Sequence, residues 1–420
     1  MLKITILLLV LQSGVMAADY FELPPIKYSA TASDEEVSKL ARELAEGRWD
    51  YPRDALGFLR AVLKKLDIPE ESQVLVFSKT SLQNDFISPQ NPRALYFSQD
   101  AYLGYVPGGV IELIVTDENL GPIFYTVTLP HDDDPPKITR ATDSCLQCHA
   151  TTQTEGVPGM LVRSVAPAPS GHPVLRAGTS ITTDASPLSE RWGGWYVTGQ
   201  SDDPHLGNRT IVDNGEPLLK FLAKPQKTLK SLHRRIDTDK YLRPTSDITA
   251  LLILEHQCRT HNLFTKAMLD YRRQLWFQES LNADLDINDP EGIIYRTCQN
   301  HAEDIVRALL FCDETTLGGD GVEGGEAFAD VFTKKGLRAS SGRSLRDLRL
   351  YGHMFKQRCS YMIYSKSFRA LPDLTKKMVY ARLLEILSKE NSPAPFDHLK
   401  KREQQRILEI LRETLPDFPR

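Results

Sequence analysis

The sequence lacks the features of a nucleic-acid-binding, membrane or zinc protein. Its net charge is only −4 over 420 residues, so we expect no nucleic-acid partner. After the first residues no apolar run is long enough to cross a bilayer, so we expect no transmembrane segment in the mature chain. An internal repeat, a second C-x-x-C pair and a His pair at zinc-ligand spacing are also missing. A soluble globular chain with one or two cores is therefore expected.

The motif Cys145-Leu146-Gln147-Cys148-His149 has the C-x-x-C-H form of a c-type haem attachment sequence. Two thiols at this spacing add to the two vinyl groups of haem, and the adjacent imidazole binds the iron. With six Cys and ten His in the chain, chance gives about two such motifs per thousand chains. We therefore expect one covalently attached haem c, held by Cys145 and Cys148, with His149 as the proximal ligand of the iron.

The two cysteines have three other conceivable uses: a redox dithiol, half of a zinc site and a structural disulfide. A thioredoxin-like dithiol opens a helix in a βαβ unit, whereas an acidic, proline-bearing loop precedes Cys145. A zinc site needs further ligands at suitable spacing. The haem interpretation is preferred to all three.

Residues 1–17 have the form of a secretory signal peptide. Lys3 supplies the charged region, residues 4–11 form a short apolar core, and residues 15–17 fit the small-residue cleavage rule. An uncleaved anchor is the alternative. Because c-type haem is attached outside the bacterial cytoplasm, the signal and the motif agree, and we expect a periplasmic or secreted protein.

Hydrophobic periodicity predicts an α+β fold in two domains. Residues 18–224 form the first, a mixed α/β haem domain with an antiparallel sheet and flanking helices; residues 225–420 form the second, an all-helical domain. The expected helices of the first lie at 33–47 and 52–69, and its strands at 73–78, 93–97, 110–115, 123–128, 160–165 and 195–198. In the second, helices are expected from 245 to beyond 267, from 289 to 312, after Ser344, after Pro372 and at 399–411.

The remaining cysteines are Cys258, Cys298, Cys312 and Cys359. In an oxidising compartment they could form two disulfides. Cys298 and Cys312 lie on one expected helix, roughly 21 Å apart, so they cannot pair with each other. Four buried thiols are the alternative.

The ligand on the distal side of the iron is left open between His205, in a glycine-bearing loop, and His256, on the apolar stripe of the long helix. His261 and Met160 are weaker candidates. An open, five-coordinate iron is a further alternative.

Haem propionates need cations, and three arginines lie near the motif in sequence: Arg140, Arg163 and Arg191. The indoles of Trp192 and Trp195, beside two glycines, either form a wall for a flat cofactor or pack in an ordinary core.

Taken together, the chain resembles a family of uncharacterised secreted bacterial proteins that carry a single c-type haem. The matching segments are VFSKTSLQ at 76–83, CLQCH at 145–149, TEGVPG at 154–159, RWGGWYVTG at 191–199, LEHQ at 254–257 and RCSYMIYS at 358–365. The resemblance implies haem binding and, by the family's label, electron transfer. It also implies a His-Met-Gly-Asn loop at His205, where this chain has Leu206 in place of Met.

We therefore expect a monohaem c-type cytochrome that transfers single electrons through Fe(II) and Fe(III) to a redox partner protein, rather than an enzyme. Two alternatives require an open distal site: a haem-based redox or gas sensor, and a peroxidase-like or small-nitrogen-oxidising haem enzyme. The spin state of the iron distinguishes a carrier from either alternative.

Overall fold

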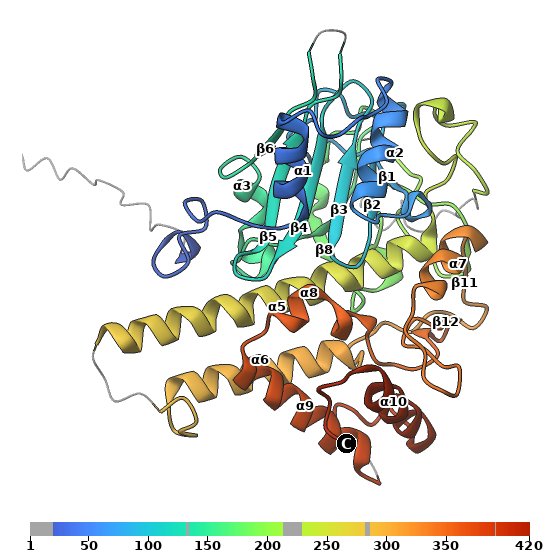
Figure 1. Ribbon diagram of the computed structural model, residues 1–420. Helices are drawn as coiled ribbons and strands as arrows, with labels where there is room; N and C mark the ends of the chain where they lie inside the picture. Colours follow the sequence, from blue (N-terminus) through green and yellow to red (C-terminus); the bar gives the residue numbers. More distant parts are fainter. Residues whose placement is uncertain (1–19, 132–133, 213–228, 282–285, 391) are drawn as a thin grey trace, which may run out of the picture.

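The computed structural model describes residues 20–131, 134–212, 229–281, 286–390 and 392–420 (Figure 1). The expected signal peptide at 1–17 lies outside these residues, and the expected domain boundary at 224/225 falls in the undescribed segment 213–228. Mixed helices and antiparallel sheet make the fold α+β, as predicted. In the described residues no helix is both long and apolar enough to span a bilayer.

A seven-stranded antiparallel sheet forms the upper layer in Figure 1, in the order β6-β5-β4-β3-β2-β1-β9. The strands are β1 (Val74–Val76), β2 (Arg93–Phe97), β3 (Ala101–Tyr105), β4 (Ile111–Asp117), β5 (Gly121–Val127), β6 (Ile138–Arg140) and β9 (Trp195–Tyr196). Most of these were predicted from their apolar, β-branched composition. β3 and β6 were not predicted, because β3 contains Gly104 and β6 has only three residues.

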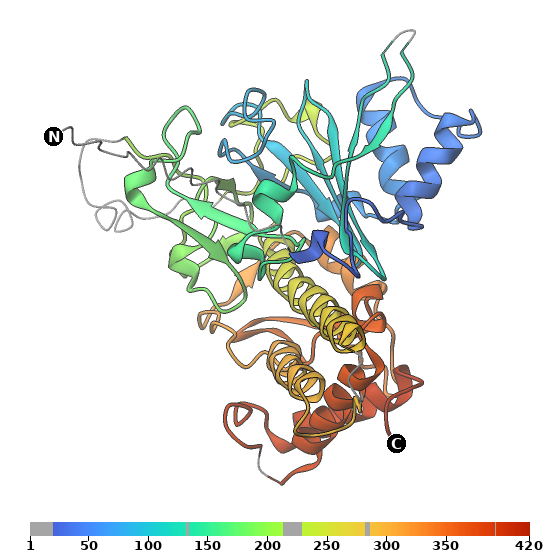
Figure 2. The ribbon, with the colours of Figure 1, turned by 90° about the vertical axis from the view of Figure 1, so that its left-hand side faces the viewer.

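Side chains of the sheet alternate between two environments. One face carries Ala94, Leu103 and Leu113, which share a core with helices α1 (Glu36–Ala45) and α2 (Ala55–Lys65). Figures 1 and 2 show these two helices lying together beside the sheet. The opposite face carries Leu95, Gly104, Glu112, Ile114 and Phe124, and it borders a cavity.

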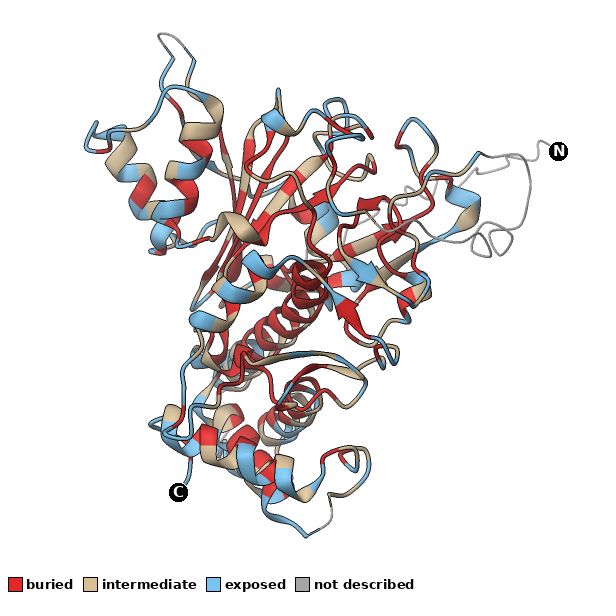
Figure 3. Ribbon diagram, turned by 90° about the vertical axis from the view of Figure 1, so that its right-hand side faces the viewer, coloured by how far each residue is buried: buried red, intermediate tan, exposed pale blue. Residues whose placement is uncertain are grey.

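Helix α5 (Ile248–Ser280) runs through the middle of the molecule, between the sheet and the C-terminal helices. Asp247 begins it by accepting a hydrogen bond from the N–H of Ala250 at 3.0 Å. Nearly every residue from Ile248 to Leu269 is buried (Figure 3). A helix that is buried on all sides must have packing partners on all sides, and α5 contributes to the cores of both halves of the chain.

The C-terminal half is mainly helical, with α6 (Ile293–Leu309), α7 (Glu326–Lys334), α8 (Lys366–Arg369), α9 (Asp373–Ser388) and α10 (Lys401–Thr414). The expectation that it is all-helical is wrong. It contains β11 (Val322–Glu323), which pairs with β10 (Gln200–Ser201) of the first half, and a hairpin of β12 (Leu348–Tyr351) and β13 (His353–Phe355).

The expected helix after Ser344 is also absent, because the chain turns there instead. The carboxylate of Asp347 accepts a hydrogen bond from the N–H of Ser344 at 3.0 Å, and β12 follows. A polar residue that can cap a helix can equally close a turn, and sequence pattern alone does not separate the two outcomes.

All six cysteines are free thiols. Cys258, Cys298 and Cys359 are buried, as the thiol alternative expected, and burial raises the pKa of each. α6 ends at Leu309, so Cys312 lies just past the helix rather than on it. The exclusion of a Cys298–Cys312 disulfide assumed that both residues lie on one helix, and the structure does not meet that assumption.

Candidate haem-binding site

The C-x-x-C-H motif forms one helical turn, α3 (Leu146–His149), which begins after Cys145. The carbonyl of Cys145 accepts hydrogen bonds from the N–H groups of Cys148 and His149, at 3.2 and 2.9 Å. Residues three and four apart on a helix share a face, and both cysteines and His149 line the same cavity. Leu146 points the other way into the core and anchors the turn.

One ring nitrogen of His149 forms a hydrogen bond that fixes the ring, and the other nitrogen can bind a metal. Its Nδ1 lies 2.9 Å from the carbonyl oxygen of Gly159, so Nδ1 carries the proton and donates it. The Nε2 atom is then the one with a lone pair for a metal. Desolvation by burial lowers the pKa of His149, which favours the neutral, metal-binding form. The ring also packs against Phe124, with centroids 5.1 Å apart.

Gly159 is itself held in place by α5. Asn262 brackets the neighbouring Met160: its Oδ1 accepts from the Met160 N–H at 2.8 Å and its Nδ2 donates to the Met160 carbonyl at 2.7 Å. Gly159 lies so close to Asn262 that a Cβ there would collide with the amide. Helix α5 therefore fixes the segment that orients His149.

The cavity lies between α3 and the face of the sheet opposite α1 and α2, and has a volume of about 140 Å³. Its walls are largely apolar, with Val76, Leu95, Ile114, Phe124 and Trp195 among the lining residues. Cys145 is half-buried and Cys148 is exposed, so the cavity opens to solvent on the side of Cys148. An apolar slot with a few polar groups is typical of cofactor sites.

Two guanidinium groups line this cavity. Arg93 forms an ion pair with Glu112 and lies across Gly104, where a Cβ would collide with it. Arg163 donates to Gln153 at 2.9 Å. Within the described chain, the Nε atoms of both Arg93 and Arg163 are buried without a hydrogen-bond partner. Buried donors are normally hydrogen-bonded to an acceptor, and the propionate carboxylates of a haem would be suitable acceptors.

The residues present fit a haem c in their chemistry: two thiols, an imidazole with Nε2 available, apolar walls and two donors for propionates. The volume is below the range of about 300–1,000 Å³ usual for such pockets. A haem held by both thiols would therefore project in part beyond the cavity, on the exposed side of Cys148.

His205 does not line this cavity. It is buried against Trp192, with ring centroids 4.8 Å apart, and its Nδ1 accepts the N–H of Gly207 at 3.1 Å. Desolvation lowers the pKa of His205 to about 3. The structure therefore places this sequence-based candidate in a separate packed loop and does not bring it to Cys145.

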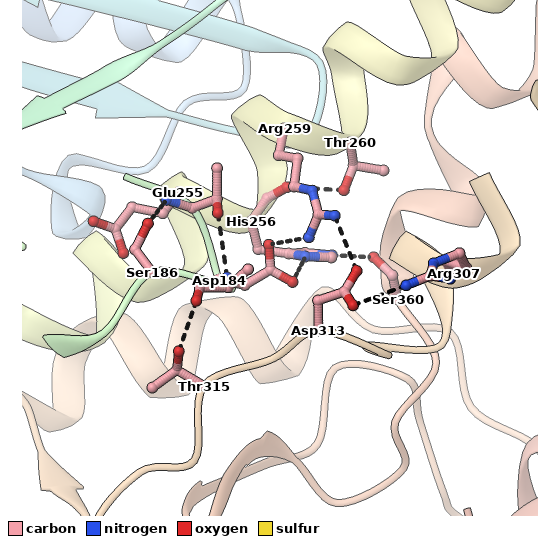
Figure 4. A network of polar contacts seen from close by, with 12 residues as sticks. Asp184, Ser186, Glu255, His256, Arg259, Thr260, Arg307, Asp313, Thr315 and Ser360 are labelled. Carbon is pink, nitrogen blue, oxygen red and sulfur yellow. Dashed lines mark hydrogen bonds and ion pairs between the residues drawn. The ribbon is translucent and has the colours of Figure 1, made fainter. Parts of the chain in front are cut away.

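His256 lies in a different polar network, shown in Figure 4. Its Nε2 is 2.6 Å from Ser360 Oγ, its Nδ1 is 3.4 Å from Asp184 Oδ2, and its ring stacks on Phe311. Desolvation opposes ionisation of Asp184, but His256 and Arg259 together lower its pKa. The imidazole is thus used for packing between α5 and the C-terminal half, away from the haem cavity.

The Asp184, His256 and Ser360 set has the residue types of a hydrolase triad. However, each of the three side chains is at most 1% exposed, so a substrate has no access to Ser360 Oγ. The arrangement is a buried hydrogen-bonded contact between distant segments.

Of the other residues predicted from the sequence, some line the cavity and some lie elsewhere. Arg163 and Trp195 line the cavity, and Trp195 Nε1 donates to the Arg163 carbonyl at 2.8 Å. Arg140 instead binds backbone carbonyls of the N-terminal segment, and Arg191 forms a buried ion pair with Glu255 at 2.7 Å. Trp192 packs in the core. His261 is hydrogen-bonded to Gln99 and Ser367.

Sequence reasoning did not find Arg93, Glu112, Gly104 and Asn262. Their only early signal is strand alternation, which puts the first three on one sheet face once the register is known. Among the described residues, no group of three His, Cys, Asp or Glu side chains is placed to hold a metal ion. A porphyrin supplies four ligands to its iron, so a haem site needs only His149 from the chain. Searches against protein-family models, curated proteins and solved structures found no match to this chain.

Proposed function

We propose that this chain carries one haem c, attached through Cys145 and Cys148 with His149 as the proximal iron ligand, and that it serves as a periplasmic or secreted single-electron carrier. The observation that carries the proposal is the geometry of α3, which turns both thiols and the imidazole into one cavity. When bound, the haem iron would cycle between Fe(II) and Fe(III).

The protein's own residues would bind and orient the cofactor. The Gly159 carbonyl accepts the Nδ1 proton of His149 and so fixes its tautomer. Leu95, Ile114 and Phe124 line the cavity and would exclude water from the bound haem. Arg93 and Arg163 would receive the propionates. Because Cys148 is exposed, one haem edge would be accessible to a redox partner protein.

A second candidate function follows from the lining of the cavity. Apart from His149, the described residues that line it include neither a histidine nor a methionine. The iron would then keep an open sixth position, which a gas sensor or a haem enzyme requires and a simple carrier does not.

Optical spectra of the matured protein test both candidates. We expect a c-type spectrum that survives denaturation, because the haem is covalent, and that is lost in Cys145→Ser/Cys148→Ser. A low-spin spectrum unchanged by carbon monoxide would support the carrier. A high-spin spectrum that shifts promptly with carbon monoxide would favour the open-site candidate, and haem that dissociates on denaturation would refute covalent attachment.

A further inference from the structure

A second cavity, of about 540 Å³, lies between the two halves of the chain. Its walls come from segments far apart in sequence: the end of α2, the turn between β2 and β3, helix α7, the short 3-10 helix at Tyr361–Tyr364 and the start of α8. Its volume falls within the range of about 300–1,000 Å³ that is typical of small-molecule sites.

Arg346 is the distinctive residue of this cavity. Its guanidinium lies against the rings of both Phe332 and Tyr361, 4.8 and 4.6 Å from their centroids, and the residue is only 8% exposed. Nη2 donates to Oε1 of Gln99 at 2.5 Å. No described carboxylate comes within ion-pair distance of Arg346, so the direct contacts of this buried guanidinium are with neutral groups.

The other cations around the cavity are already neutralised. Lys335 pairs with Asp67 at 2.7 Å, and Lys366 pairs with Glu36. Asp100 also lines the cavity, but its carboxylate accepts the backbone N–H of Lys366 at 2.8 Å and forms no ion pair with Arg346. Two charges in the described cavity wall are therefore left without an ion-pair partner, the guanidinium of Arg346 and the carboxylate of Asp100, and Asp100 acts on Arg346 only at longer range.

We propose that this cavity binds a small carboxylate with an aromatic or aliphatic body. The planar guanidinium of Arg346 is suited to bidentate pairing with a carboxylate. Its contacts with two rings and with Gln99 pre-orient it, so little side-chain entropy remains to be lost on binding. The apolar body would lie against Phe97, Phe328 and Val331. Inorganic phosphate offers the anion but would leave these apolar walls without a partner.

A hydrogen-bond chain joins this cavity to the haem cavity. Tyr361, which stacks on Arg346, donates to Oε1 of Gln257 at 2.6 Å, and Nε2 of Gln257 donates to the hydroxyl of Tyr102 at 2.8 Å. Tyr102 lines the haem cavity. A ligand in the second cavity would thus affect hydrogen bonds that extend to the wall of the first cavity. This effect on the haem rests on the proposed function, whereas binding of the ligand to the second cavity does not.

Calorimetric titration of the full-length protein with 3-phenylpropanoate tests the site. We expect saturable binding to the wild type, and at least tenfold weaker binding of the neutral analogue 3-phenylpropan-1-ol and of inorganic phosphate. Gln99→Glu should weaken 3-phenylpropanoate binding at least tenfold, because it supplies Arg346 with an internal carboxylate at nearly constant shape. Arg343→Gln is the matched control, since Arg343 pairs with Glu409 outside the cavity.

Several results would overturn the proposal: no heat of binding up to about 10 mM ligand, equal binding by wild type and Gln99→Glu, or phosphate binding as tightly as 3-phenylpropanoate. Arg346→Gln is a second variant for the same titration and should also weaken 3-phenylpropanoate binding. Circular dichroism is used to confirm that this variant folds. The Cys145→Ser/Cys148→Ser protein should still bind 3-phenylpropanoate. Failure to attach haem and failure to bind the carboxylate are thereby separated.

Discussion

Nε2 of Gln257 donates a hydrogen bond to the hydroxyl of Tyr102 at 2.8 Å, and this contact places a polar side chain of α5 directly behind the cavity that Cys145 and His149 line. The same amide nitrogen donates to the Ser98 carbonyl at 2.7 Å, and the amide oxygen accepts from Tyr361. One buried glutamine therefore links strand β3, the turn before it and the C-terminal half.

Replacing Gln257 with leucine should destabilise the protein by about 2–4 kcal/mol, because the buried hydroxyls of Tyr102 and Tyr361 would each lose a partner. Urea unfolding followed by circular dichroism measures the change. Gln299→Leu, at an exposed position on α6, is the control and should cost less than about 0.5 kcal/mol. Equal stability of the two variants would contradict the importance of the link.

Asn262→Leu should loosen the segment that orients His149, because both backbone groups of Met160 would lose their partner. We expect a loss of about 2–3 kcal/mol of stability and, in the haem-loaded protein, a mixture of axial geometries in the electron paramagnetic resonance spectrum. Asn300→Leu, at an exposed position on α6, should change neither. A homogeneous, wild-type signal from Asn262→Leu would show that His149 is oriented without α5.

The contribution of Glu314 and Glu255 to the stability of the folded protein should fall as the pH rises from about 5 to 8. Burial raises the pKa of Glu314 to about 8 and that of Glu255 to about 7, above the ordinary value of 4.5. A group with a raised pKa stabilises the folded state below its unfolded pKa. That contribution is lost as the pH rises through the folded pKa, by on the order of 1.4 kcal/mol for each pH unit that separates the two pKa values.

Glu314→Gln should remove the Glu314 contribution to the pH dependence and make the slope of stability against pH more positive, because the amide cannot ionise and still accepts the Met354 N–H that Glu314 accepts at 2.8 Å. Urea unfolding at several pH values is the measurement, and exposed Glu326→Gln is the control. A slope that Glu314→Gln leaves unchanged would mean that this carboxyl does not titrate in the interval.

His205→Ala and His256→Gln should leave the optical spectrum of the haem-loaded protein unchanged, because the structure places neither imidazole at the cavity. His256→Gln should still cost about 1–3 kcal/mol of stability, through the lost contact with Ser360. His149→Ala is the positive control and should alter the spectrum strongly. A Soret shift in either of the first two variants would identify that residue as an iron ligand.

Most of the secondary structure could be predicted because its signals are local. α1 and α2 begin and end close to the expected residues, and α5 and α9 begin close to them, with Asp54 and Asp247 as side-chain caps of α2 and α5. The failures came where local signals are ambiguous. β3 contains Gly104, and its five residues pack between β2 and β4 through pairing that no local pattern reveals.

The residues of the candidate site likewise fall into those that local sequence could identify and those that it could not. Cys145, Cys148 and His149 could be identified from spacing, because one helical turn fixes their relation. The choice of His205 or His256 as distal ligand used only loop and helix position. It could not take account of Ser360, which is 104 residues from His256 in sequence yet hydrogen-bonded to it.

By itself the sequence determined most of the helices and strands and the C-x-x-C-H turn, since helix periodicity, strand alternation and the spacing of that motif act over a few residues. Only the tertiary structure decided which side chains share a cavity. Arg346 reaches Gln99 across 247 residues, and Asn262 reaches Met160 across 102. The physical reason is that sheet register and the burial of α5 on all sides bring such residues together, and both depend on the whole chain packing at once.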